Sequence, residues 1–110
     1  MLIDTHAHLN NLKDTEEVVR ESIESDVTEI ISVSTDIHSS IDNVKIANKF
    51  NQVFSAVGIH PCDIETLELD DLDKIESLCT DTRNKAIGEI GLDFYYSRDN
   101  SKQQLAFFDR

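Results

Sequence analysis

Apolar residues along the chain form two kinds of pattern, which predict alternating strands and helices. Four segments, most of them rich in β-branched residues, are predicted strands: one that begins at Leu2 and runs into residues 4–6, then residues 27–33, 53–57 and 86–90. Four segments with apolar residues at helical spacing are predicted helices: residues 14–26, 36–50, 67–79 and 101–109. The chain therefore consists of four βα units in succession.

The helical spacing also predicts which positions face a core. Asp14 is the expected N-cap of the first helix, with Glu17 three residues later. The expected buried positions of the four helices are Val18, Val19 and Ile23; Ile37, Ile41, Val44 and Ala47; Leu69, Leu72, Ile75 and Leu78; and Leu105, Ala106 and Phe108.

Strict alternation of strands and helices predicts an α/β fold with parallel strands covered by helices. Two architectures have this pattern. An open doubly wound sheet is nearly complete at 110 residues, whereas a (β/α)8 barrel needs about 200 residues or more. Four βα units would then make about half a barrel, and periodicity alone leaves both architectures open.

Composition bounds the size and the partners of the molecule. A chain of 110 residues and 12.5 kDa holds one domain at most. Ten basic and 22 acidic residues give a formal net charge of −12, so the surface is not expected to coat a nucleic-acid backbone by cationic contacts alone. If the protein acts on nucleic acid, a bound metal ion is the natural source of positive charge.

The small number of cysteines and the N-terminal sequence favour a cytoplasmic protein. Cys62 and Cys79 are too few for a disulfide scaffold and are expected to be reduced thiols. The first residues have neither a basic region nor a long apolar region, so no signal peptide is expected. The apolar runs are too short to span a membrane.

His6 and His8 are the first candidate metal ligands. In an extended chain, residues two apart point to the same side, so these imidazoles would offer two nitrogens to one divalent metal just after a buried strand. Asp4 is a candidate to accept a hydrogen bond from a ring N–H of one of these histidines without binding the metal itself. A surface accident is the alternative interpretation of this short pattern.

Two further candidates follow later predicted strands. His60 stands between Ile59 and Pro61 at the end of the third strand, where an ordinary loop histidine is the alternative. Glu89 is expected inside the apolar fourth strand, where a carboxylate is costly unless it is paired or bound to metal.

Other polar residues carry weaker signals. Asp93 is equally consistent with a cap and with a functional group, and His38 is expected to be a solvated helix residue. Tyr95 and Tyr96 could stack on a base or simply cover the mouth of a site.

The evidence that the four main candidates form a functional site is their common location. His6, His8, His60 and Glu89 come from three predicted strands and lie at or near the carboxyl ends. Parallel strands bring those ends to one face, where such folds build active sites. We therefore expect one shared, metal-centred site.

Three segments, in this order, resemble the TatD family of metal-dependent hydrolases: DTHAHL at residues 4–9, GIHP at 58–61 and GEIGLD at 88–93. The resemblance runs through the whole chain. It implies an amidohydrolase-like (β/α)8 barrel with two divalent ions, commonly Mg, Mn or Zn. It implies that His6 and His8 bind one ion, that Glu89 bridges both, and that His60 assists with substrate without binding metal.

The resemblance also implies the activity, a DNase, often a 3′ to 5′ exonuclease on single-stranded DNA. A hydrolase of other esters or amides on the same scaffold is an alternative. Two further histidines and an aspartate of the family site would follow residue 110, so residues 1–110 are expected to be the N-terminal half of a barrel. An inactive or partner-binding fragment, self-associating through exposed half-barrel edges, is the remaining alternative.

Overall fold

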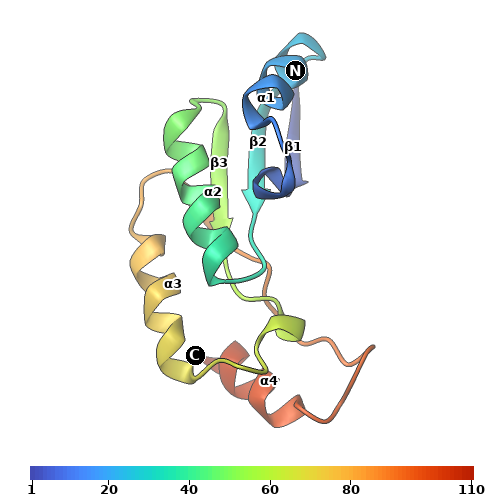
Figure 1. Ribbon diagram of the computed structural model, residues 1–110, viewed down its shortest axis with the longest axis vertical. Helices are drawn as coiled ribbons and strands as arrows, with labels where there is room; N and C mark the ends of the chain where they lie inside the picture. The colour runs from blue at the N-terminus through green and yellow to red at the C-terminus, as the bar shows by residue number, and fades with distance from the viewer.

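The computed structural model describes residues 1–110 and contains one four-stranded sheet (Figure 1). Its strands are β1 (Leu2–Ala7), β2 (Val27–Val33), β3 (Val53–Val57) and β4 (Asn84–Ile87). Each neighbouring pair is parallel. The α-helices are α1 (Thr15–Glu24), α2 (Ile37–Lys49), α3 (Leu72–Cys79) and α4 (Ser101–Asp109), and the short 3₁₀ turns are η1 (Leu9–Asn11), η2 (Pro61–Asp63) and η3 (Leu69–Asp71).

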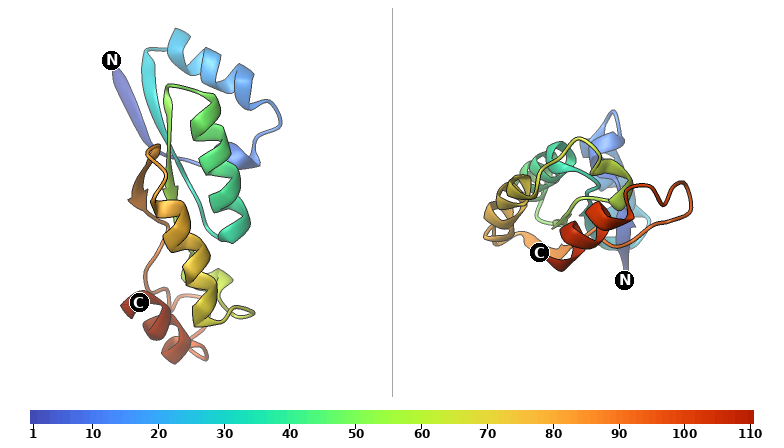
Figure 2. Two further views of the ribbon diagram at one scale, coloured as in Figure 1. Left: turned by 90° about the vertical axis from the view of Figure 1, so that its left-hand side faces the viewer. Right: turned by 90° about the horizontal axis from the view of Figure 1, so that it is seen from below.

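The strand order distinguishes the two architectures that the sequence left open. The sheet runs β1-β2-β3-β4, so each strand lies beside the next one in the chain. A doubly wound sheet instead reverses its order at a switch point. Because crossovers between parallel strands are right-handed, an unreversed order places every connecting helix on the same face. Figure 2 shows α1, α2 and α3 together on one side of the strands. The fold is therefore a partial (β/α) barrel, and the predicted barrel class is confirmed.

The hydrophobic core fills the space between the sheet and these helices. Two clusters of buried side chains occupy it: Leu9, Val19, Ile30, Ala47 and Val53, and then Val44, Val57, Ile59, Ile64 and Ile75. The helices begin where the sequence places N-cap residues. Asp14 accepts a hydrogen bond from the Glu17 N–H at 3.0 Å, and Asp36 accepts one from the Ser39 N–H at 2.7 Å.

The two central strands and α4 match their predicted ranges, whereas β1, β4 and the start of α3 differ. β1 extends to Ala7, and it is exposed rather than buried because it is an edge strand with no outer neighbour. The predicted third helix begins later, at Leu72, because residues 69–71 form the 3₁₀ turn η3. Leu69 is consequently exposed.

β4 also differs from its prediction, because it covers Asn84–Ile87 rather than residues 86–90. Glu89 thus lies beyond the strand and not inside it. The predicted buried side of α4 is wrong as well. Gln104 is buried and Phe107 packs on the core, whereas Leu105, Ala106 and Phe108 are exposed.

Apolar side chains are exposed along both edges of the sheet. Leu2 and Ile3 on β1 are 60% and 49% exposed, and Ile87 on β4 is 60% exposed. Neither edge has a further strand beside it. In addition, none of the helices combines the length and apolar character that crossing a lipid bilayer requires.

Candidate metal centre

The carboxyl ends of the strands all point to one end of the molecule, where η2 and α4 lie (Figure 1). His6 belongs to the last part of β1, and His8 follows that strand directly. His60 comes three residues after β3, and Glu89 two residues after β4. The structure thus places the four predicted residues at or just beyond strand carboxyl ends.

Three of the four residues form one cluster. The His6 Nε2 and Glu89 Oε1 atoms are 3.0 Å apart, and the rings of His6 and His8 have centroids 5.1 Å apart. One nitrogen from each histidine and one carboxylate oxygen lie within 4.8 Å of one another. The side chain of Glu89 is 29% exposed and that of His6 55%, so a small ligand has access from solvent.

Glu89 reaches His6 because the chain crosses the sheet after β4. β1 and β4 are opposite edges of the sheet. Beyond Ile87, the Gly88 N–H donates to Val57 O of β3 at 2.9 Å, and the Glu89 N–H donates to Ser34 O, which follows β2, at 2.6 Å. Two successive hydrogen bonds to two different strands carry the carboxylate toward β1.

This crossing requires a glycine at position 58. A Cβ atom on Gly58 would lie 2.8 Å from Gly88 C and 2.9 Å from Glu89 O, closer than side chains approach backbone atoms. By contrast, a Cβ on Gly88 would meet only a Val33 methyl group at 3.9 Å. The bare backbone of Gly58 therefore makes room for the segment that carries Glu89.

The imidazole of His8 is oriented by a main-chain carbonyl. Its Nδ1 atom lies 2.8 Å from Val33 O. Because a carbonyl oxygen only accepts hydrogen bonds, Nδ1 carries the proton and the neutral ring keeps a lone pair on Nε2. The sequence suggested Asp4 for such a role, but Asp4 instead accepts from the His6 main-chain N–H at 3.0 Å.

The donor chemistry of this cluster fits a divalent metal ion. Two imidazole nitrogens and a carboxylate oxygen are ligands shared by Zn, Mn and related ions. A carbonyl behind a histidine ligand is the usual arrangement that fixes its tautomer. Three protein ligands would leave coordination positions open for water or substrate.

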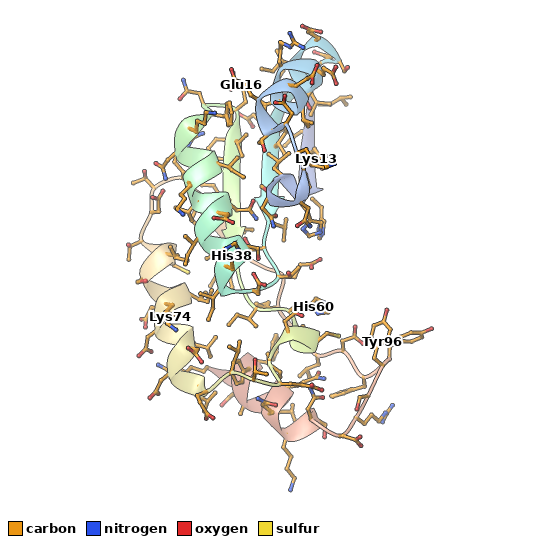
Figure 3. All side chains as sticks on the ribbon, viewed as in Figure 1. Lys13, Glu16, His38, His60, Lys74 and Tyr96 are labelled. Atoms are coloured by element: carbon orange, nitrogen blue, oxygen red, sulfur yellow. The ribbon has the colours of Figure 1, made fainter.

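His60 belongs to a separate cluster. It groups with Cys62 and Asp93, with donor atoms that also lie within 4.8 Å of one another. Its Nδ1 accepts a hydrogen bond from the Cys62 main-chain N–H at 3.1 Å, so the neutral ring carries its proton on Nε2. Figure 3 shows His60 in the loop that follows β3.

The pKa of the thiol in this second cluster lies above its usual value. Desolvation, and then the negative charges of Asp93 and Asp63, raise the pKa of Cys62. The Cys62 Sγ and Asp93 Oδ2 atoms are 3.9 Å apart. A protonated thiol and an imidazole nitrogen already engaged by an N–H are poor metal donors, so this cluster is less suited to metal than the first.

The remaining candidates lie in solvent. His38 is exposed near the start of α2, with its Nδ1 3.2 Å from an oxygen of Asp42, as expected for a solvated helix residue. Tyr95 and Tyr96 are exposed and pack edge to face, with centroids 4.8 Å apart. Figure 3 shows Tyr96 in the loop after β4, pointing away from His60.

A pocket of about 570 Å³ lies elsewhere. It is lined mainly by apolar side chains of α3, α4 and the segments that follow β3 and β4. It includes none of the four predicted site residues. The chemistry of the cluster, rather than cavity size, therefore identifies the site.

Sequence reasoning missed the buried side chains behind the cluster. Asn43 and Ser34 are both fully buried, and they are hydrogen-bonded to each other at 3.0 Å. A signal was present, because Ser39, Ser40 and Asn43 repeat at helical spacing on the face of α2 that also carries Val44 and Ala47. Polar residues on a core-facing stripe need partners there.

Comparison with known proteins gives a consistent family. A family model described as TatD related DNase matches residues 3–110. An uncharacterized metal-dependent hydrolase of Buchnera aphidicola is 34% identical over 97% of this chain and 45% of its own length. The 3′-5′ ssDNA/RNA exonuclease TatD of Citrobacter koseri is 29% identical over 88% of this chain and 37% of its own length.

The fold has a counterpart in a solved structure. The crystal structure of YjjV, a TatD homolog from Escherichia coli K12, superposes with a TM-score of 0.88 at 24% identity. The match covers 98% of this chain and 44% of that one. The chain thus spans less than half the length of the relatives it matches.

Proposed function

The chain belongs to the TatD-related DNase family, and we propose that it takes part in metal-dependent hydrolysis of ester bonds through His6, His8 and Glu89. One observation carries the proposal: three side chains from two opposite edges of the sheet converge, with ligand atoms within 4.8 Å of one another. Mutual geometry of this kind, with metal-ligating atoms from separate elements meeting at one point, is the structural criterion for a functional site.

Each proposed ligand has a definite part. His8 offers Nε2, because its Nδ1 donates to Val33 O. His6 Nε2 lies 3.0 Å from the Glu89 carboxylate and donates a hydrogen bond to it in the metal-free chain. A divalent ion bound between these two atoms would replace the proton of that hydrogen bond, so metal binding by His6 requires Nε2 to release its proton. Glu89 has two carboxylate oxygens and could contact a second ion, as the expected two-ion site requires. When bound, a divalent ion activates water and offsets charge on the substrate.

His60 is proposed to bind substrate rather than metal. Its Nδ1 accepts the Cys62 N–H, which leaves Nε2–H as a hydrogen-bond donor. Such a donor can stabilise the negative oxygens of a phosphodiester as charge develops on them.

The proposed substrate is single-stranded DNA. Support comes from relatives in Citrobacter koseri and Salmonella typhimurium that are named as 3′-5′ ssDNA/RNA exonucleases. The net charge of −12 means that surface cations would contribute little to binding. Bound ions would then have to provide most of the attraction to phosphate, so binding is expected to be local.

We also propose that residues 1–110 form the N-terminal half of such a barrel and self-associate through β1 and β4. The exposed Leu2, Ile3 and Ile87 on unpaired edges support this, because such edges pair with other strands. Light scattering coupled to size-exclusion chromatography tests the self-association. A single monomeric species at all concentrations would contradict the proposed self-association.

The cytoplasmic location predicted from the sequence stays a prediction, supported by the free thiols of Cys62 and Cys79.

Reconstitution tests the hydrolase. A protein that carries residues 1–110 together with the rest of the barrel is stripped with EDTA and supplied with Mg²⁺, Mn²⁺ or Zn²⁺, and nucleotide release from labelled single-stranded DNA is measured. We expect no release without metal and restored release with at least one ion. Release that persists in EDTA, or that no ion restores, would contradict the proposal.

A comparison of two substrates distinguishes the proposed phosphodiester hydrolase from a hydrolase of other esters. Bis(p-nitrophenyl) phosphate reports phosphodiester hydrolysis, and p-nitrophenyl acetate reports carboxylic ester hydrolysis. Preference for the phosphodiester is expected, whereas metal-dependent cleavage of the acetate alone would favour a hydrolase of other esters.

A further inference from the structure

Polar side chains are buried between the sheet and α2, directly behind the candidate metal centre. Such a location is usually apolar, because an unpaired polar group there costs free energy. In this protein every buried side-chain nitrogen and oxygen has a hydrogen-bond partner. The buried polar residues of α2, of the strands and of the residue after β2 are Ser32, Ser34, Ser39, Ser40, Asn43 and Ser55.

Asn43 is the centre of this network. It lies on α2 and is 0% exposed. Its Oδ1 accepts from the Ser32 hydroxyl at 2.7 Å. Its Nδ2 donates to the Ser34 hydroxyl at 3.0 Å and to Val33 O at 3.2 Å, and it lies 3.3 Å from Asn10 Oδ1. One side chain therefore connects the ends of β1 and β2.

One branch of the network leads to His8. The oxygen of Val33 accepts from Asn43 Nδ2 and from His8 Nδ1, the latter at 2.8 Å. The Ser32 hydroxyl, which donates to Asn43, also accepts the N–H of Leu9, the residue after His8, at 3.0 Å. Asn43 thus contributes to holding both the ring of His8 and its backbone.

The other branch leads to Glu89. Ser34 accepts from Asn43 through its hydroxyl and from the Glu89 N–H through its carbonyl oxygen, the latter at 2.6 Å. One turn before Asn43 on α2, the Ser40 hydroxyl contacts Gly58 N at 3.2 Å and Gly58 O at 3.3 Å. Gly58 is the residue over which the segment carrying Glu89 passes.

We propose that Asn43 is a positioning residue. It holds the Val33 carbonyl that sets the tautomer and orientation of His8, and through the Ser34 hydroxyl it holds the residue whose carbonyl places Glu89. The inference rests on the proposed function, because His8 and Glu89 are metal ligands only in that proposal. Partners of this kind commonly change metal affinity by about 10- to 100-fold when removed. Asn43 reaches His8 by donating a hydrogen bond to Val33 O, and it reaches Glu89 by donating one to the Ser34 hydroxyl.

The test compares Asn43→Ala with the unchanged chain by two measurements. In the metal-free chain, imidazole ¹⁵N shifts at a pH where the ring is neutral report which nitrogen of His8 is protonated. We expect Nδ1–H in the unchanged chain and a mixture of tautomers in the variant. Calorimetric titration with Zn²⁺ should show affinity lowered about 10-fold or more.

Two further variants separate positioning from general destabilisation. Val44→Ala removes buried volume from the next residue of α2 without touching the network, so it should leave the His8 tautomer and the Zn²⁺ affinity within about twofold. Ser34→Ala keeps the carbonyl that holds Glu89 and removes only the hydroxyl, so a smaller loss in affinity is expected. It also serves as the test if Asn43→Ala does not fold.

The outcomes are distinct. A folded Asn43→Ala chain with unchanged His8 tautomer and Zn²⁺ affinity would overturn the proposal. If Asn43→Ala does not fold, Ser34→Ala with unchanged Zn²⁺ affinity would overturn it. An equal loss in Val44→Ala would also overturn it. If the unchanged chain binds no Zn²⁺, the proposed metal function fails, and the tautomer shifts still decide whether Asn43 positions His8.

Discussion

The molecule has two three-residue clusters at the same end of its sheet, and they differ in how hydrogen bonds use the imidazole nitrogens. Each set has donor atoms within 4.8 Å of one another. In the first, His8 donates to a carbonyl and keeps a free lone pair. In the second, the Nδ1 lone pair of His60 is already engaged by an N–H, and the pKa of Cys62 is raised.

The comparison shows that donor spacing alone does not identify a metal site. The hydrogen bonds behind each donor decide whether it has a lone pair or a proton to offer. On this basis the first cluster is suited to a cation, whereas in the second cluster the His60 Nε2–H is a hydrogen-bond donor.

The largest expected difference between the clusters concerns their carboxylates. Glu89→Ala should lower Zn²⁺ affinity by at least about 100-fold, beyond the usual effect of a partner that does not contact the ion. Asp93→Ala is the matched control from the same segment, and we expect affinity within about twofold. Isothermal titration measures both, and equal losses would remove the distinction between the clusters.

A second prediction separates metal binding from substrate binding. His60→Ala should reduce the rate of phosphodiester hydrolysis by about 100-fold, as loss of a donor to a developing oxyanion does, while Zn²⁺ affinity changes less than about twofold. His38→Ala, which alters an exposed histidine, should change neither quantity. A large loss of Zn²⁺ affinity in His60→Ala would place this residue among the ligands instead.

A third prediction concerns the crossing that delivers Glu89 to the first cluster. Gly58→Ala places a Cβ against the backbone of Gly88 and Glu89, so the free energy of unfolding should fall by about 1–3 kcal/mol. Zn²⁺ affinity should fall with it. Gly88→Ala is the control, since its Cβ has an ordinary contact distance. Chemical denaturation compares the two, and equal stability would contradict the close approach.

The smallest expected effect concerns the reactivity of the Cys62 thiol in the second cluster. The negative charge of Asp93 disfavours the Cys62 thiolate. Asp93→Asn should therefore lower the pKa of Cys62 and raise its alkylation rate by iodoacetamide at pH 8 by about two- to tenfold. Cys79 is an internal control, because burial and Glu76 raise the pKa of its thiol. A slower reaction at Cys62 would contradict the sign.

Much of the fold was predictable from the sequence, because the central strands and helices carry regular patterns. β2 and β3 have their predicted bounds, and Asp14 and Asp36 mark the helix starts. The bounds of α4 were also predictable, but its buried side was not. Apolar residues such as Leu105 look buried in a pattern although no neighbour covers them.

The site was predictable only as a set of residues at strand ends. The crossing of residues 88–89 depends on hydrogen bonds to Val57 and Ser34, which no local pattern encodes. The tautomer of His60 likewise depends on a main-chain N–H at Cys62. Hydrogen-bond direction, unlike residue type, becomes known only when the chain is folded.

Zinc-edge anomalous diffraction tests the central claim most directly. Crystals of the chain with stoichiometric Zn²⁺ allow either cluster to bind, because Zn²⁺ accepts imidazole, carboxylate and thiolate ligands. We predict an anomalous peak bonded to His6, His8 and Glu89 and none at His60, Cys62 and Asp93. A peak at the second cluster alone, or none at the first, would contradict the account.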